Sequence, residues 1–243
     1  MLQKARCIAL HSVKYGDSSL IASLYSYEFG RVTLMVNGAY GKSKSSKKAI
    51  FFQPLNLINI VFYPSKSGGM GRLKEVSLLQ TNSSINVSHV KMAIALFMGE
   101  VIYTTIREQE SNPSLFNFLE VSIMALDAIE EGISNFHLLF IAQLSKYLGF
   151  FPNGSFSAST PYFDYRNGFF VSHKPQHNQF FTSEMSSLLS SLVETPFENA
   201  DQIHLIGTQR NEFINSMLHY YAYHNSTAQN VKSHQILAQV FDS

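Results

Sequence analysis

The sequence is poor in cysteine and has no long apolar run. A single cysteine among 243 residues excludes an intramolecular disulfide and a zinc site built from several thiolates. The longest apolar stretch, 92–103, is much shorter than the ~20 residues of a membrane span and contains Glu100. The first residues lack the apolar core and cleavage site of a signal peptide. We therefore expect an intracellular protein of one or two domains.

Motifs of the common enzyme classes are missing as well. The sequence has no P-loop, no dinucleotide-binding glycine motif and no G-x-S-x-G nucleophile elbow. Cys7 lies inside an apolar segment, where a buried thiol is the simpler interpretation. His173 and His177 are weak metal candidates, because Pro175 separates them and zinc needs three or four converging ligands. We expect no catalytic residue, no bound metal and no cofactor.

Charge is divided unevenly along the chain. The formal net charge is only +1, but residues 1–80 hold 11 Lys and Arg against 3 Asp and Glu, a net charge of +8. Residues 81–243 hold 7 against 14, a net charge of −7. A basic block suits a polyanion such as nucleic acid or anionic lipid, and chance segregation of surface charge is the alternative.

The basic block has the alternating pattern of short strands separated by turns. Within 31–36, for example, Val32, Leu34 and Val36 fall on one face. The expected strands are Cys7–Val13, Leu20–Ser26, Arg31–Val36, Leu55–Tyr63 and Arg72–Gln80. Five short strands predict a small barrel, with the OB-fold as the first candidate and an SH3-like barrel as the alternative.

After residue 80 the apolar period becomes that of helices. The expected helices are 88–108, 114–130, 135–150, 183–194, 201–224 and 233–241. Residues 151–181 interrupt this pattern, and Asn167-Gly168 predicts a hairpin over 162–171. The prediction is an α+β protein with an OB-fold domain over 1–80 and a mostly helical domain over 81–243 that carries the irregular insertion.

Lysines interleaved with serines at 42–48 are the sharpest local feature. Lysines neutralise phosphates, and serine hydroxyls donate to phosphate oxygens. Aromatic side chains can stack on bases for about 1–3 kcal/mol each, and we expect a few to face solvent, Tyr40 first and Tyr15 next. The DNA-binding candidates are Arg31, Tyr40, Lys42, Lys44, Lys47, Lys48, Lys66, Arg72 and Lys74.

Several short segments occur in an order typical of one protein family. They are IALH at 8–11, YGDSSL at 15–20, FGRV at 29–32, NGA at 37–39, QPL at 53–55, LSKYLGFFP at 144–152 and the closing segment 219–241. This ordered set resembles the bacterial RecO recombination and repair mediators.

The resemblance implies an N-terminal OB-fold, a helical C-terminal domain and a non-enzymatic, cytoplasmic and nucleoid-associated protein. Such proteins bind single- and double-stranded DNA and anneal complementary strands. With RecR they help the RecA recombinase replace single-stranded-DNA-binding protein, whose acidic C-terminal tail typically docks on the helical domain. The candidates for that contact are Lys91, Arg107, Lys146 and Arg210.

The insertion departs from the family pattern. Many members carry four zinc-binding cysteines in the region equivalent to 153–178, where this chain has none. We therefore expect a metal-free insertion held by the aromatic residues Tyr162, Phe163, Phe169 and Phe170. Two other functions remain open: an OB-fold RNA-binding module, and a hydrolase that uses the histidine-rich C-terminal half.

Overall fold

The computed structural model describes residues 1–40, 48–65 and 69–242. The chain forms two compact units, Met1–Asp127 and Ala128–Ser243. The change from strands to helices falls near residue 80, as expected, but the compact units divide later because the first two helices group with the barrel. In the described part, no helix is long and apolar enough to cross a membrane.

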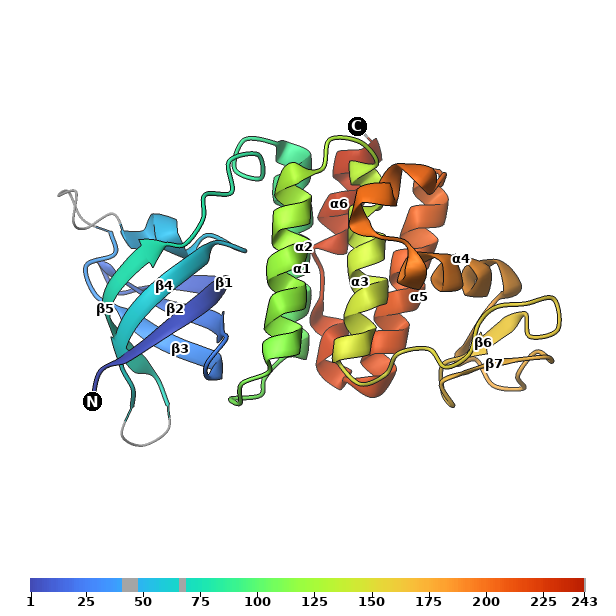
Figure 1. Cartoon of the computed structure of the whole chain (residues 1–243), viewed down its shortest axis with the longest axis horizontal. Coiled ribbons are helices and arrows are strands. Elements are labelled where there is room, and N and C mark those ends of the chain that lie inside the picture. The colour runs from blue at the N-terminus through green and yellow to red at the C-terminus, as the bar shows by residue number, and fades with distance from the viewer. Residues whose placement is uncertain (41–47, 66–68, 243) are drawn as a thin grey trace. The chain divides into compact units, whose positions relative to one another are not determined.

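The first unit contains a barrel, a short 3-10 helix and two long helices (Figure 1). Its elements are β1 (Gln3–Tyr15), β2 (Ser19–Ser26), β3 (Gly30–Val36), η2 (Lys48–Phe52), β4 (Leu57–Tyr63), β5 (Gly71–Leu78), α1 (His89–Thr105) and α2 (Pro113–Ala128). All five predicted strands are therefore present, each within a few residues of its expected range.

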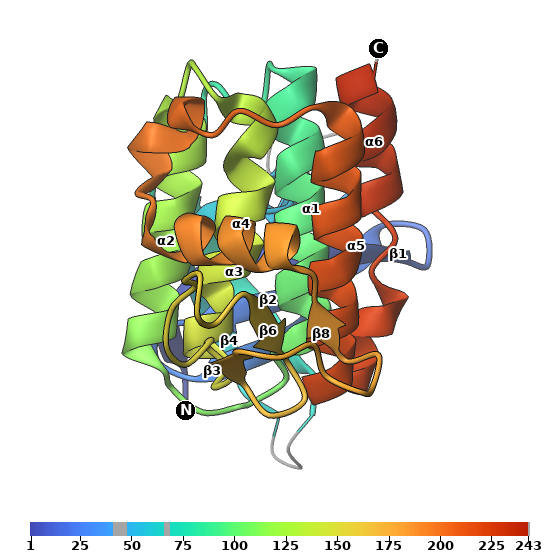
Figure 2. The same cartoon turned by 90° about the vertical axis from the view of Figure 1, so that its right-hand side faces the viewer.

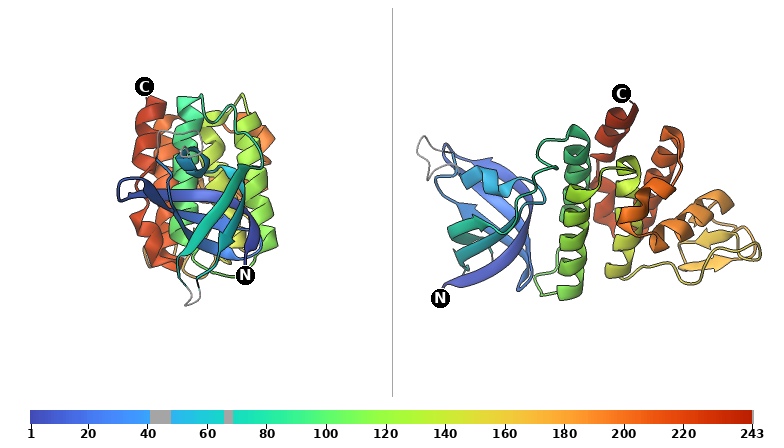
Figure 3. Two further views of the ribbon diagram at one scale, coloured as in Figure 1. Left: turned by 90° about the vertical axis from the view of Figure 1, so that its left-hand side faces the viewer. Right: turned by 45° about the horizontal axis from the view of Figure 1, so that its top comes forward.

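Among the described residues, five strands close into a barrel in the order β1-β2-β3-β5-β4, seen from one side in Figure 3. The long strand β1 pairs with β4 through residues 3–8 and with β2 through 7–15. A register shift between Ala9 and His11 bends it from one neighbour to the other. Strands β3 and β5 are parallel and share only the pairs Leu34–Gly71 and Met35–Arg72.

Alternate residues of the strands fill the barrel interior. Leu34 and Val36 are fully buried, as the alternation predicts, whereas Val32 is only half-buried. Cys7 also belongs to this core, and burial raises the pKa of its thiol well above the usual value. A thiol held neutral in an apolar core packs and does not react, which agrees with the sequence interpretation.

Gly30 attaches the barrel to the segment that follows α1. Its φ is +63°, and a Cβ atom there would lie 2.3 Å from the carbonyl oxygen of Glu110. The next residue, Arg31, donates its backbone N–H to the carbonyl oxygen of Glu108 at 2.8 Å. Only glycine permits both the left-handed backbone and this close approach.

Side-chain caps begin the two long helices. Ser88 accepts the backbone N–H of Lys91 at the start of α1, at 3.3 Å. Asn112 accepts the N–H of Leu115 at the start of α2, at 3.1 Å. Each cap satisfies one of the N–H groups that a helix start leaves unpaired.

The second unit is mostly helical. Its elements are η3 (Ile133–Asn135), α3 (Phe136–Tyr147), β6 (Tyr162–Asp164), β7 (Phe169–Val171), β8 (Phe180–Phe181), α4 (Ser183–Glu194), η4 (Phe197–Gln202), α5 (Gly207–His224), η5 (Ser226–Asn230) and α6 (His234–Asp242). The single helix expected over 201–224 is wrong at its start. Residues 197–202 form the separate short helix η4 instead, and the Asn135 amide donates to the carbonyl oxygens of Ala200 and Ile203 before α5 begins.

The insertion forms the predicted hairpin, in which Tyr162 of β6 pairs with Val171 of β7 (Figure 2). The buried Phe163 ring contacts Phe170, Phe181 and Tyr220, so aromatic packing holds the hairpin to α5. One expectation is wrong: the Phe169 side chain is 55% exposed. It lies on the outer face of β7, opposite to the face that packs.

A carboxylate shapes the hairpin turn. Asp164, which is 5% exposed, accepts the backbone N–H groups of Arg166 and Asn167 at 3.0 and 3.2 Å. It also accepts the side-chain amide of Asn167 at 2.8 Å. These bonds fix the turn before Gly168, whose φ of +79° completes it.

Candidate nucleic-acid interface

The strand register places five side chains in one row across the outside of the barrel. Val13 pairs with Ile21, Ile21 with Met35, Met35 with Arg72, and Arg72 with Tyr63. Directly paired residues share a face of the sheet, so this strand row crosses all five strands. Val13 and Tyr63 are 52% and 48% exposed, and Arg72 is exposed. An exposed ring, apolar side chains and a guanidinium are what base stacking and phosphate neutralisation require.

A hollow of about 650 Å³ lies at the end of the row where β4 meets β5. Its lining residues are Met35, Tyr63, Pro64, Met70, Gly71 and Arg72. A Cβ atom on Gly71 would lie 2.7 Å from the carbonyl oxygen of Tyr63, so glycine is needed for this approach of the two strands. The hollow therefore borders both the aromatic ring and the guanidinium of the row.

Two further aromatic side chains are exposed near the β1–β2 turn. Tyr15 is 56% exposed and Tyr40 is 43% exposed, which confirms the expectation that these rings face solvent. The Lys14 ammonium lies 5.9 Å from the centre of the Tyr40 ring, and Tyr40 donates its N–H to Ser18 at 3.0 Å. The sequence interpretation missed Tyr63, although its position next to Pro64 at a strand end was a usable signal.

The predicted basic contacts differ in their placement. Lys48 begins η2 and is half-buried, while Lys74 is exposed on β5 and pairs with Glu75 at 3.3 Å. Such an exposed pair contributes little and leaves Lys74 able to meet a phosphate. The remaining candidates Lys42, Lys44, Lys47 and Lys66 lie outside the described residues.

Arg31 has a different role from the expected phosphate contact. Its Nη1 atom donates to the carbonyl oxygens of Tyr103 at 2.9 Å and of Ile106 at 2.8 Å. Its guanidinium also lies 4.3 Å from the centre of the Tyr103 ring. Through these contacts Arg31 joins the barrel to the end of α1, where carbonyl oxygens need donors.

The two partner candidates of the first unit lie far apart. Lys91 is buried near the start of α1, where its Nζ donates to Ser84 Oγ at 2.7 Å and to the Asp127 carbonyl oxygen at 2.8 Å. Arg107 is exposed beyond the other end of the same helix. The helix from Lys91 to its end at Thr105 alone spans about 21 Å, so the two side chains do not form one pocket.

The candidates of the second unit also do not converge. Arg210, in the first turn of α5, donates to the Leu205 carbonyl oxygen at 2.6 Å and acts electrostatically on His137 near the start of α3. Lys146 is exposed in the last turn of α3. The two cations therefore lie toward opposite ends of α3.

The insertion does not fit a zinc ion. His177 Nε2 lies 3.3 Å from an Asp164 oxygen, and its Nδ1 accepts the backbone N–H of Gln179 at 3.1 Å. His173 bonds instead to its neighbour Ser172 at 2.8 Å. Across 1–40, 48–65 and 69–242, no three His, Cys, Asp or Glu side chains converge as metal ligands. A zinc site needs at least three, so the residues present hold this hairpin by hydrogen bonds and aromatic packing.

Comparisons with known proteins agree with this arrangement. The family model for the N-terminal part of recombination protein O matches residues 1–82, and the model for its C-terminal part matches 88–232. The chain is 32% identical over 242 residues to the DNA repair protein RecO of Azobacteroides pseudotrichonymphae. It is 35% identical over 246 aligned positions to the DNA repair protein RecO of Bacteroides fragilis. Both alignments cover all of this chain and all of the relative. The chain therefore belongs to the RecO family of DNA repair and recombination proteins, and its barrel is the OB-fold of that family's N-terminal domain.

Proposed function

We propose that this chain is a non-enzymatic recombination mediator that binds single- and double-stranded DNA on the outside of the barrel. The strand row carries the proposal, since it combines the exposed Tyr63 ring with the Arg72 guanidinium on a block of net charge +8. Membership of the RecO family supports a role in repair. Binding to DNA would also place the protein on the nucleoid.

The basic barrel suits strand annealing without a nucleotide cofactor. Phosphates of two complementary strands repel each other, and cations on one surface lower that repulsion by neutralising both. Exposed aromatic rings also stack on unpaired bases. A duplex offers no unpaired bases, so this contact favours single strands. The barrel can therefore hold single strands close together until base pairing takes over.

The protein contacts of the mediator belong, in this proposal, to the helical residues 81–243. Their net charge of −7 disfavours DNA and leaves this part for proteins. The partners are RecR and the acidic tail of single-stranded-DNA-binding protein, and through them RecA is loaded. Arg107 and Lys146 are the exposed members of the candidate set and are the first positions to change.

Replacing Lys42, Lys44, Lys47 and Lys48 with alanine tests the electrostatic part of the proposal. With about five phosphate contacts, log affinity for a single strand falls with log salt at a slope near −3.5, and each lost contact removes about 0.7. The variant should thus show a slope closer to zero by up to about 2.8. Fluorescence anisotropy with a labelled oligonucleotide over a salt series measures it. Changing the exposed Lys146 and Lys174 to alanine is the control for a loss of positive charge elsewhere. An unchanged slope in the variant with the four lysines replaced would exclude these lysines from the DNA contact.

Tyr63→Ala tests the stacking part. Loss of one stacked base costs about 1–3 kcal/mol, so affinity for a single strand should fall about 5- to 150-fold while duplex affinity changes little. Tyr63→Phe keeps the ring and should bind as the wild type does. Tyr223→Ala removes a comparably exposed tyrosine, at 47%, from α5 and serves as the control. Equal single-strand affinity of Tyr63→Ala and the wild type would remove the ring from the site.

A further inference from the structure

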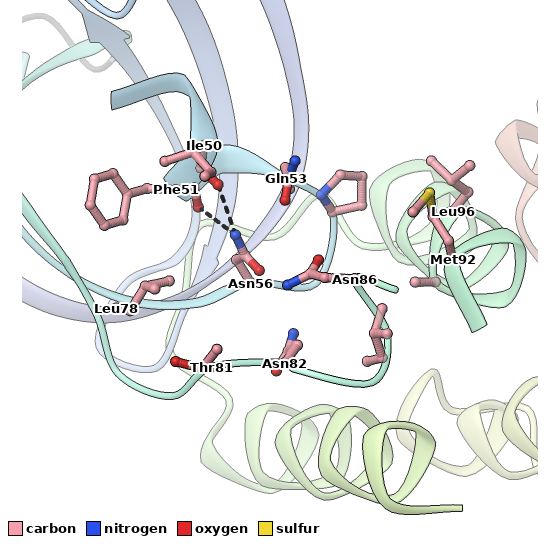
Figure 4. Close-up of a pocket in the computed structure, with 13 residues that line it drawn as sticks. Ile50, Phe51, Gln53, Asn56, Leu78, Thr81, Asn82, Asn86, Met92 and Leu96 are labelled. Atoms are coloured by element: carbon pink, nitrogen blue, oxygen red, sulfur yellow. Dashed lines mark hydrogen bonds between the residues drawn. The ribbon is translucent and has the colours of Figure 1, made fainter. Parts of the chain in front are cut away.

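The first unit contains another pocket, which shares no lining residue with the strand row. Its volume is about 570 Å³, within the range of pockets that hold small ligands. One wall comes from η2 and the turn after it, a second from the segment after β5, and a third from α1 (Figure 4). The apolar wall residues include Ile50, Pro54, Leu78, Ile85, Met92 and Leu96.

Strained backbone lies beside this pocket. Leu55 has a φ of +64°, and it is the sole non-glycine residue with a positive φ in the described part of the chain. Asn82 holds it by donating to the Leu55 carbonyl oxygen at 3.0 Å, and Leu55 donates its own N–H to Ala9 at 2.7 Å. A left-handed backbone is strained for a leucine, and such residues often occur at ligand sites. Here it positions the lining residues on either side, Pro54 and Asn56.

The pocket lining is uncharged but rich in amides. Asn56 donates to the carbonyl oxygen of Ile50 at 3.0 Å, which secures the η2 wall. Gln53 and Asn86 are exposed, and within the described residues neither side-chain amide has a hydrogen-bonding partner. Figure 4 shows these amides gathered between η2, the segment after β5 and α1. An anionic ligand would find no cation among the lining residues, whereas a neutral ligand with apolar faces and a polar edge fits.

A nucleobase has this combination of properties. It is planar and uncharged, and its edge carries hydrogen-bond donors and acceptors side by side. Asn and Gln amides present the same pair of groups, which is why they recognise base edges. The η2 wall of the pocket begins at the basic residue Lys48, two residues before Ile50.

We propose that this pocket receives an unpaired nucleobase of the single strand bound by the barrel. The inference rests on the proposed function, since the base arrives with its strand. A base inside a duplex uses its polar edge for its complement, so the pocket selects single-stranded over double-stranded DNA.

The test compares a thymidine oligonucleotide with an abasic oligonucleotide of the same phosphate number. The variant Gln53→Leu/Asn86→Leu removes the two available amides with little change in volume or charge. Loss of one recognised base should weaken binding of the thymidine oligonucleotide about tenfold. Affinity for the abasic oligonucleotide should stay at the wild-type value, because the phosphate contacts remain.

Each outcome has a distinct meaning. If the variant binds the thymidine oligonucleotide as tightly as the wild type, the pocket proposal is overturned and the proposed function stands. If the wild type binds neither oligonucleotide, both are overturned. Crosslinking of the wild type with a 4-thiothymidine oligonucleotide gives a readout independent of variant folding. A crosslinked peptide that contains Met92 or Leu96 supports the proposal, whereas crosslinks confined to the strand row contradict it.

Discussion

Replacing Gly30 with alanine should lower the free energy of unfolding of the first unit by about 4 kcal/mol. The positive φ alone costs an alanine about 1–2 kcal/mol. The new Cβ atom would also lie 2.3 to 2.8 Å from backbone atoms of Glu108 and Glu110, which must move. Backbone strain combined with a steric clash puts the change among the most destabilising single substitutions, and urea denaturation measures it.

Gly16 offers a matched control for this prediction. Its φ of +61° is nearly the same as that of Gly30, but nothing lies within 4 Å of a Cβ atom built on it. Gly16→Ala should therefore cost only the conformational part, about 1–2 kcal/mol. Equal losses in the two variants would show that the contact of Gly30 with residues 108–110 does not restrain the barrel.

Acidification from pH 7 to pH 5 should cost the second unit about 2 kcal/mol through His137 alone. Burial in α3, with a smaller contribution from Arg210, lowers the pKa of His137 to about 3. The unfolded chain takes up this proton near pH 6.5, while the folded chain does not until about pH 3. Stability is therefore lost as the pH falls from about 6.5 toward 3, by about 1.4 kcal/mol for each pH unit.

The variant His137→Phe removes this titration and keeps a ring to stack on Phe241. The difference in free energy of unfolding between wild type and variant should shift by about 2 kcal/mol between pH 7 and pH 5, in favour of the variant. His219→Phe, at an exposed position of α5, controls for the loss of a histidine as such. A constant difference between wild type and His137→Phe would mean that this imidazole titrates alike in both states.

The sequence predicted local structure better than it predicted long-range pairing. Alternation and turn residues located the five barrel strands and the hairpin, because both signals lie within a few neighbouring residues. The role of Arg31 depends on carbonyl groups 72 and 75 residues away, and no local pattern reveals those partners. The helix expected over 201–224 begins late, at Gly207, and the segment before it bonds to Asn135, a distant donor.

The sequence predicted several residues of the candidate interface but not how the strands arrange them in space. Tyr40, Arg72 and Lys74 are exposed, as a nucleic-acid contact requires. The alignment of Val13 with Tyr63 across five strands follows from the register of four strand pairs. Register depends on strand order, and the parallel β3–β5 contact that closes the barrel has no signal in the sequence.

The parallel contact between β3 and β5 is the junction that closes the barrel. Its two residue pairs make it the shortest of the strand junctions, so local opening of the closed sheet begins there at the lowest cost. One of the two pairs, Met35 with Arg72, also belongs to the strand row. A nucleic-acid strand lying along the strand row would therefore span the β3–β5 junction. It would be bound only while this junction is paired. By thermodynamic linkage, such a ligand stabilises the closed barrel to which it binds.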